Sequence, residues 1–235
     1  MISYLLKSLN SGLLLAIAIY SLTAQAQPKL GSNRNSLWEE IVFQDSLEPP
    51  GDPEPKDTKG SGSRDGSKCS TQEQNIKALM PERNYGLTLQ KRPSVFVSLP
   101  KTKAKQVLLS FRDEGGKYYQ KAFLPITKYG IVNFSLPENK PPLTIGKNYQ
   151  WSLVVICENT VQPDNPTFQG WVQRVETTPL VDRELTGKSA IEKAKWYGKK
   201  GYWYDMVEEI EKARKTEPNN LKLSADLQNL LNSEQ

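Results

Sequence analysis

Histidine is absent from the chain, and this absence removes the commonest forms of side-chain catalysis. Histidine is the usual general base near neutral pH, so a Ser-His-Asp triad and a Cys-His pair are both excluded. A carboxylate pair acting on a glycoside remains possible. The candidate carboxylates in the expected β region, none marked by spacing as partners, are Asp113, Glu114, Glu138, Glu158, Asp164 and Glu176. We therefore expect no enzymatic activity and no catalytic residue.

Long apolar runs are also missing, except for one near the N-terminus. Lys7 precedes an apolar run from Leu9 to Leu22, and small residues surround Gln25 in Ala24–Ala26. This order predicts a secretory signal peptide over residues 1–26, cleaved between Ala26 and Gln27. The alternative is an uncleaved anchor helix, but about 14 apolar residues are fewer than the roughly 20 that cross a bilayer. We expect a mature protein in the periplasm or outside the cell, with no membrane span.

Cysteine is limited to Cys69 and Cys157. Two cysteines without histidine cannot form a four-ligand zinc site unless carboxylates contribute, and Asp164 with Asn165 gives too few ligands for calcium. We expect no metal and no cofactor. In an exported protein an even number of cysteines favours a disulfide. In the chain-entropy model, a disulfide that closes a loop of this length stabilises the folded state by about 4–5 kcal/mol. Two free thiols are the alternative.

Residues 27–68 hold eight acidic and six basic residues among many prolines and glycines. Such a segment buries too little apolar surface to offset chain entropy, so we expect a disordered linker. One short apolar patch, residues 37–43, contains Leu37, Trp38 and Phe43. This patch could dock on a partner or fold back on the following domain.

Residues 69–181 read as a β domain. A short helix over Gln72–Met80, ended by Pro81, is the one helical expectation. Short strand-like runs separated by proline and glycine follow, at Val95–Leu99, Val107–Arg112, Lys117–Leu124, Ile131–Leu136, Asn148–Cys157 and Phe168–Glu176. Strands at short intervals with no helices between them predict an antiparallel, Ig-like β-sandwich.

The last two of these strands each carry a tryptophan. Trp151, Leu153 and Val155 share one face of a strand that is largely apolar on both faces, which predicts a central strand covered on both sides. Trp171 lies in the next strand, beside Gly170, whose missing side chain suggests a bulge or close packing. We expect both tryptophans in the core; an aromatic platform for sugars is the alternative.

Residues 182–235 have a helical pattern. Ile191, Ala194 and Tyr197 mark a first helix, and apolar residues from Trp203 onward mark a second. Leu223, Leu227, Leu230 and Leu231 mark a third. The series Ala194, Tyr197, Met206, Ile210, Ala213 and Pro218 resembles one tetratricopeptide (TPR) repeat. Trp203, Met206 and Ile210 could bind a partner, or the helices could pack against the β domain.

Several short motifs occur together in a fixed order. They are Cys69, Ala78–Pro81, Arg92–Phe96, Leu124–Pro125, Gly130–Val132, Leu143–Trp151, Cys157 and Gly170–Val175. In these motifs the chain, from Cys69 to its C-terminus, resembles the cyanobacterial family catalogued as domain of unknown function 928. The resemblance implies an exported protein with no assigned activity, and it supplies no catalytic residues.

Charge is uneven along the chain, because residues 69–181 hold 14 basic and 8 acidic residues. A basic domain can bind acidic glycans, nucleic acid or anionic lipid, but no alternation of arginine with aromatics suggests nucleic acid. We expect a periplasmic or cell-surface protein-interaction module whose partner is an envelope or periplasmic protein. The alternative is a carbohydrate-binding module or weak carboxylate-dependent glycan hydrolase that uses Tyr118, Tyr119 and Trp203.

Overall fold

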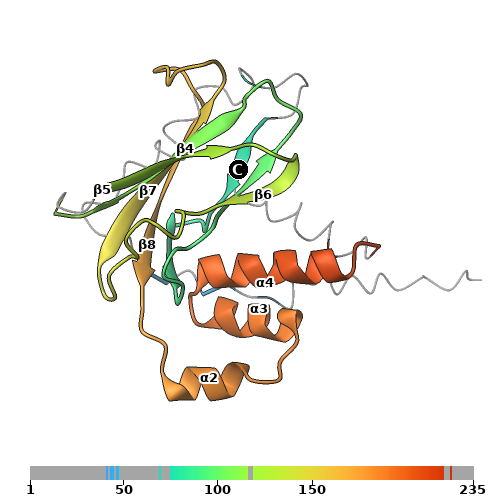
Figure 1. The fold of residues 1–235 in the computed structure, drawn as a ribbon. Coiled ribbons are helices and arrows are strands. Elements are labelled where there is room, and N and C mark those ends of the chain that lie inside the picture. The colour runs from blue at the N-terminus through green and yellow to red at the C-terminus, as the bar shows by residue number, and fades with distance from the viewer. Residues whose placement is uncertain are drawn as a thin grey trace, which may run out of the picture. The chain divides into compact units, whose positions relative to one another are not determined.

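The computed structural model describes Ile41, Phe43, Gln44, Ser46, Leu47, Cys69, residues 75–115 and 119–219, and Leu223. All of them belong to one compact unit, Asn35–Gln235. They form two mostly antiparallel β-sheets followed by three helices (Figure 1). The expected signal peptide, Leu37, Trp38, Tyr118 and, apart from Leu223, the expected third helix lie outside the described residues.

The larger sheet has five strands in the order β2-β8-β7-β4-β5. Their bounds are β2 Tyr85–Thr88, β4 Gln106–Asp113, β5 Tyr119–Pro125, β7 Asn148–Ile156 and β8 Thr167–Arg174. All pairs are antiparallel except β2 with β8, which is parallel. The strand that carries Trp151, β7, is the central strand, as predicted. The expectation that both of its faces are covered is wrong, because Gln150, Ser152 and Val154 on its second face are only half-buried.

The smaller sheet has the order β1-β3-β6, with β1 Lys77–Leu79, β3 Val95–Leu99 and β6 Gly130–Phe134. The predicted helix over Gln72–Met80 is therefore wrong in its described part. Lys77–Leu79 pairs antiparallel with Phe96–Ser98 and buries Leu79. Sheet pairing and burial outweigh a helix propensity that is worth only a few tenths of a kcal/mol per residue.

One continuous core cluster joins both sheets and the last helix. Val97 of β3, Leu109 of β4 and Leu153 of β7 are fully buried, as are Trp151 and Val155. The face of β7 that carries Trp151, Leu153 and Val155 therefore lies in the core, as predicted. Because the same cluster extends into the helices, the core belongs to the whole described unit.

The strand β8 faces the core with the residues opposite to those predicted. Phe168, Gly170 and Val172 are buried, whereas Trp171 is half-buried on the other face of the sheet. Gly170 pairs with Trp151, and a Cβ at this glycine would lie 2.5 Å from the indole Cζ2. The prediction that Trp171 lies in the core is therefore wrong. The Trp151 indole occupies the core space over Gly170. Because side chains alternate between the two faces of a strand, Trp171 lies on the opposite face.

Three helices follow the sheets: α2 Pro179–Leu185, α3 Ala190–Lys199 and α4 Trp203–Thr216. Ser189 and Glu192 form a reciprocal capping box at the start of α3, which fixes its first turn. The helix α2 was not predicted, and the boundary expected at Asp182 falls inside it. None of the helices in the described part of the chain has the length and apolar character to cross a membrane.

The helix α4 is part of the core. Trp203, Met206 and Ile210 are at most 2% exposed, so the proposal that they bind a partner as an exposed face is wrong. The Phe43 ring packs edge-on against Trp203 with centroids 4.9 Å apart. Phe43, the described member of the three patch residues considered for partner binding, therefore folds back on the chain's own domain. Gly86 permits the close approach of α4 to β2, because a Cβ at residue 86 would lie 2.6 Å from the Trp203 Cβ.

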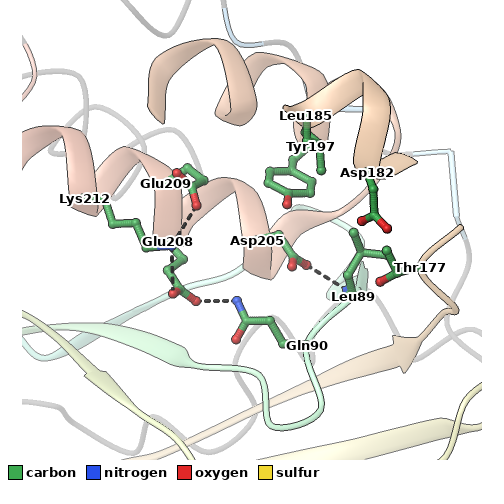
Figure 2. Close-up of a pocket in the computed structure, with 10 residues that line it drawn as sticks. All are labelled: Leu89, Gln90, Thr177, Asp182, Leu185, Tyr197, Asp205, Glu208, Glu209 and Lys212. Atoms are coloured by element: carbon green, nitrogen blue, oxygen red, sulfur yellow. Dashed lines mark hydrogen bonds and ion pairs between the residues drawn. The ribbon is translucent and has the colours of Figure 1, made fainter. Parts of the chain in front are cut away.

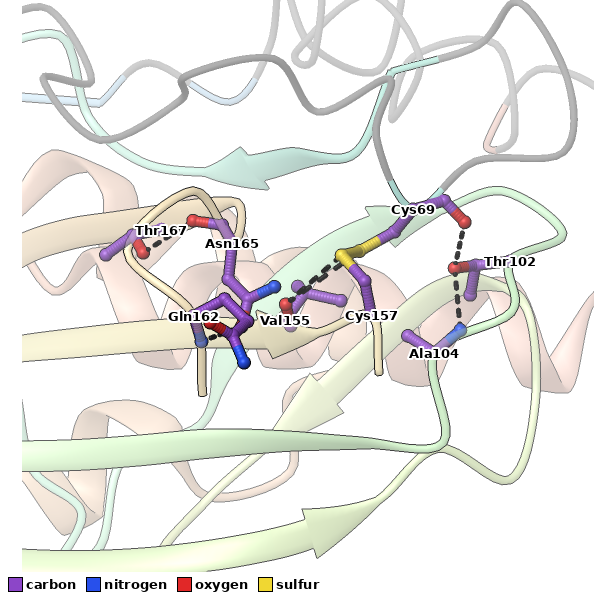
Figure 3. Close-up of a disulfide and its surroundings, with 8 residues drawn as sticks. All are labelled: Cys69, Thr102, Ala104, Val155, Cys157, Gln162, Asn165 and Thr167. Atoms are coloured by element: carbon purple, nitrogen blue, oxygen red, sulfur yellow. Dashed lines mark hydrogen bonds between the residues drawn. A yellow bond between two sulfur atoms is a disulfide. The ribbon is translucent and has the colours of Figure 1, made fainter. Parts of the chain in front are cut away.

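The disulfide prediction is confirmed: Cys69 and Cys157 are bonded, with Cα atoms 5.1 Å apart and a sequence separation of 88 (Figure 3). Cys69 is 2% exposed. Its carbonyl oxygen accepts hydrogen bonds from the Thr102 hydroxyl at 2.6 Å and the Lys103 N–H at 3.2 Å. The disulfide therefore ties Cys69 to the end of β7, and the two hydrogen bonds tie it to the loop before β4.

Candidate functional site

The five-stranded sheet has one face in the core and one face exposed, which we call the outer face. Along β4, β7 and β8 the buried residues alternate with half-buried or exposed ones, as expected when only one face of a sheet is covered. The outer face consists of Leu108, Ser110, Arg112, Tyr119, Lys121, Phe123, Gln150, Ser152, Val154, Gln169 and Trp171.

The strand register arranges these side chains in rows across the sheet. One row is apolar, with Phe123 opposite Leu108 and Leu108 opposite Val154. Neighbours directly opposite each other on a sheet are within contact distance, so this row makes a continuous apolar strip. The strip ends at the edge strand β5, where Phe123 is 56% exposed.

A second row on the outer face combines aromatic and polar side chains. Tyr119 lies opposite Arg112, Arg112 opposite Gln150, and Gln150 opposite Trp171. The Arg112 guanidinium donates a hydrogen bond of 2.8 Å to the Gln150 side-chain oxygen, which holds both side chains along the row. Tyr119 is 51% exposed, and the Lys121 ammonium lies 5.9 Å from its ring centroid. This row can therefore offer both ring faces and hydrogen-bond donors.

A pocket of about 300 Å³ lies apart from the outer face. Its lining comes from the loop after β2, the segment around α2, and helices α3 and α4 (Figure 2). The lining residues are Leu89, Gln90, Thr177, Asp182, Leu185, Tyr197, Asp205, Glu208, Glu209 and Lys212. Because four of these ten are carboxylates, the pocket is strongly acidic.

Asp205 is the buried carboxylate of this pocket, at 4% exposed. Burial raises its pKa to about 7, although hydrogen bonds from Thr88 and from the Leu89 N–H, at 3.1 Å, partly stabilise the ionised form. Figure 2 shows the carboxylate turned toward Leu89. Asp205 thus joins the end of β2 to the first turn of α4 and can hold a proton near neutral pH.

Three other charged groups of the pocket, Lys212, Glu208 and Glu209, are paired with one another. The Lys212 ammonium lies 3.2 Å from Glu208 and 2.7 Å from Glu209, and the Gln90 amide donates to the Glu208 carboxylate. Burial, together with the nearby carboxylates, raises the pKa of the Tyr197 hydroxyl, so this group stays protonated. The bonds from Gln90 to Glu208 and from Leu89 to Asp205 cross between elements, so this pocket helps to hold α4 against the loop after β2.

The carboxylates singled out from the sequence do not line this pocket, and no metal-binding group of three or more ligands occurs among the described residues. Asp205 was missed because an acidic residue in a first helical turn is ordinary. A usable signal existed in the sequence: Asp205 interrupts a stretch, Trp203–Val207, whose other members are all apolar or aromatic. Both of its immediate neighbours, Tyr204 and Met206, are buried.

Comparison with known proteins identifies a family and no activity. Residues 59–235 match the family described as Domain of Unknown Function (DUF928), and the chain belongs to that family. No curated protein matches the chain. Among solved structures, the fn3 domain of human collagen alpha-1(XX) chain is similar at 13% identity and a TM-score of 0.31. The match covers 49% of this chain and 92% of that domain.

Proposed function

We propose that this protein is an exported, non-enzymatic interaction module, and that its protein partner in the periplasm or envelope binds the outer face. The observation that carries the proposal is the pair Tyr119 and Phe123, each more than half exposed on the same face of the edge strand β5. Exposed aromatic and apolar side chains grouped on one surface are typical of protein-binding sites.

The composition of the outer face supports a protein ligand. The apolar strip at Phe123, Leu108 and Val154 resembles the centre of a protein interface, where aromatic residues are enriched. Arg112 is of a residue type that is also enriched at interfaces, and it lies four residues along β4 from Leu108 of this strip. Lys121 sits between the two rows on the free edge and discourages uncontrolled edge-to-edge pairing.

We further propose the finer architecture. The two sheets would pack as an Ig-like β-sandwich, a view supported by the core cluster that contains residues of both. The helices α3 and α4 would form a TPR-like hairpin, supported by the small buried residues Ala194 and Gly198 on α3 and Ala213 on α4. Such a hairpin needs a neighbour to cover its apolar face, and the β domain supplies it.

A second candidate function is a carbohydrate-binding module. Trp171 and Tyr119 lie at opposite ends of one row with the Arg112 and Gln150 side chains between them, which suits the ring faces and hydroxyls of a sugar chain. Of the aromatics considered for sugar binding, Trp203 is buried and Tyr119 is exposed. A glycan on this row would change Trp171 fluorescence, and substitution Trp171→Phe would remove the change.

The experiment that tests the proposal is site-specific photocrosslinking in the source cells. A photoreactive phenylalanine analogue replaces Phe123 in one strain and Leu180 of α2 in a second, matched strain, because both side chains are 56% exposed. We expect one reproducible crosslinked envelope protein from position 123 and none from position 180. Absence of a product from position 123, or the same products from both positions, contradicts the proposal.

Export is tested separately in the same strains. Mass spectrometry of the crosslinking protein from the periplasmic and extracellular fractions should give an N-terminus at Gln27. A chain that retains Met1 and stays with the cytoplasmic fraction contradicts the export proposal, whatever the crosslinking shows.

A further inference from the structure

We propose a second binding site, for a linear acidic polysaccharide, on the loop before β4 and the facing loop before β6. Its centre is the lysine row, Lys101, Lys103 and Lys105. All three lysines are exposed, while Thr102 and Ala104 between them are 8% and 4% exposed. Strict alternation of this kind is the pattern of an extended backbone, in which alternate side chains lie about 6–7 Å apart on one side.

The backbone that carries the lysine row is fixed at several points (Figure 3). The Thr102 hydroxyl donates to the Cys69 carbonyl at 2.6 Å and accepts the Ala104 N–H at 3.1 Å. The Lys103 N–H also donates to the Cys69 carbonyl, and Cys69 is held by its disulfide. A charged row on a fixed backbone binds with a smaller loss of entropy than a row on a free loop.

A facing segment extends the same surface. The Ile126 N–H donates to the Lys105 carbonyl at 2.8 Å, and the Tyr129 hydroxyl lies 3.4 Å from the Thr102 carbonyl as a donor. Tyr129 is nevertheless 52% exposed, and Lys128 beside it is also exposed. Residues 101–106 and 124–129 together contain four lysines and no carboxylate, so this end of the domain carries much of its positive charge.

The arrangement favours an acidic polysaccharide over the other polyanions. A row of charges along an extended backbone suits a linear ligand, and the Tyr129 ring, with its hydroxyl tied to Thr102, offers a face on which a sugar ring can lie. A bilayer surface would call for apolar side chains able to insert beside the lysines. Single-stranded nucleic acid would call for several aromatics among them, and this surface has one.

The test uses fluorescein-labelled alginate, a polyuronate, with the full mature chain. Neutral dextran, phosphatidylglycerol-containing vesicles and an oligothymidylate serve as the other ligands. The binding variant carries Lys103→Gln, Lys105→Gln and Lys128→Gln. The matched control carries Lys188→Gln, Lys199→Gln and Lys200→Gln. These three lysines are also exposed, and their replacement makes the same change of net charge near α3.

We expect alginate to bind, and to bind more weakly as ionic strength rises. Single exposed charge contacts are worth roughly 1.5- to 5-fold each, so the binding variant should bind about 3- to 100-fold more weakly, with the control within about twofold of the natural chain. Thr102→Val keeps every charge but removes both of its hydrogen bonds. In a variant with an unchanged circular dichroism spectrum, it should weaken alginate binding and leave the salt dependence intact.

Three results would overturn the proposal: no alginate binding, equal weakening by both triple variants, or tighter binding to the vesicles or the oligonucleotide than to alginate. The site is distinct from the outer face, so the crosslinking result at Phe123 does not decide it. The binding variant should leave that crosslink unchanged, which separates failure of this proposal from failure of the proposed function.

Discussion

The Trp151 indole packs closely over Gly170 in the five-stranded sheet, and this contact makes a sharp prediction for Gly170→Ala. A Cβ at this position would lie 2.5 Å from Cζ2 and 2.7 Å from Cε2 of Trp151, and 2.8 Å from the Asn84 Oδ1. Trp151 cannot retreat without loss, because it is fully buried and its Nε1–H donates to the Tyr204 hydroxyl at 2.6 Å.

The expected cost combines two effects. Forcing one extra methyl group into a filled core costs about 1–3 kcal/mol. Lengthening or breaking the hydrogen bond from Trp151 to Tyr204 adds about 0.5–1.5 kcal/mol. We therefore expect Gly170→Ala to lower the free energy of unfolding by about 2–4 kcal/mol, measured by urea unfolding followed by far-UV circular dichroism.

Two comparisons show whether the indole is the cause. Gly115→Ala is the matched control, because a Cβ there meets nothing within 4 Å, and it should change stability by less than about 0.5 kcal/mol. In a Trp151→Phe background, which lacks the two closest indole atoms, Gly170→Ala should cost about 1–2 kcal/mol less than in the natural chain. Equal cost in both backgrounds would refute the steric reasoning.

The remaining predictions concern the core hydrogen bonds, the buried carboxyl and the disulfide. Tyr204→Phe should lower the free energy of unfolding by about 1–3 kcal/mol, because it leaves the buried Trp151 N–H without an acceptor; urea unfolding of the purified variant checks this. Burial raises the pKa of Asp205 from 3.8 to about 7. The folded state therefore binds this proton more tightly than the unfolded state, and its contribution to stability, complete below pH 4, is lost as pH rises through 7. Unfolding measured at several pH values should show this loss, and Asp205→Asn should reduce it; an unchanged pH profile in the variant contradicts the assignment. Replacing Cys69 and Cys157 by serine should destabilise the chain by about 4–5 kcal/mol, which thermal unfolding with and without reductant checks.

Much of the β architecture could be predicted because it depends on local alternation and on punctuation by proline and glycine. The largely apolar β7 strand is central, as its sequence predicts, but its second face is only half-buried, which the sequence pattern does not show. The helices α3 and α4 follow from a 3.6-residue period. The errors arose where long-range partners decide: Lys77–Leu79 becomes a strand because β3 pairs with it, and β2 joins the sheet as a parallel strand next to β8.

The candidate sites were harder to predict for a related reason. Sequence alternation shows that Trp171 and Val172 lie on opposite faces but does not show which face is the core. The choice of face depends on the Trp151 indole, which packs over Gly170 of the neighbouring strand. Gly170 therefore faces the core, and Trp171 lies on the outer face. The pocket around Asp205 likewise depends on contact with Leu89, more than a hundred positions earlier in the chain.

The helical segment is better regarded as part of the β domain's core than as an appendage. Trp203, Met206 and Ile210 are buried in the same cluster as the strands, and the Tyr204 hydroxyl joins Trp151 of β7 to the Trp171 carbonyl of β8. Removing residues 182–235 would therefore uncover the sheet and disrupt these bonds. Loss of a partner after such a truncation would report unfolding, so the binding surfaces have to be tested by single exposed side chains such as Phe123.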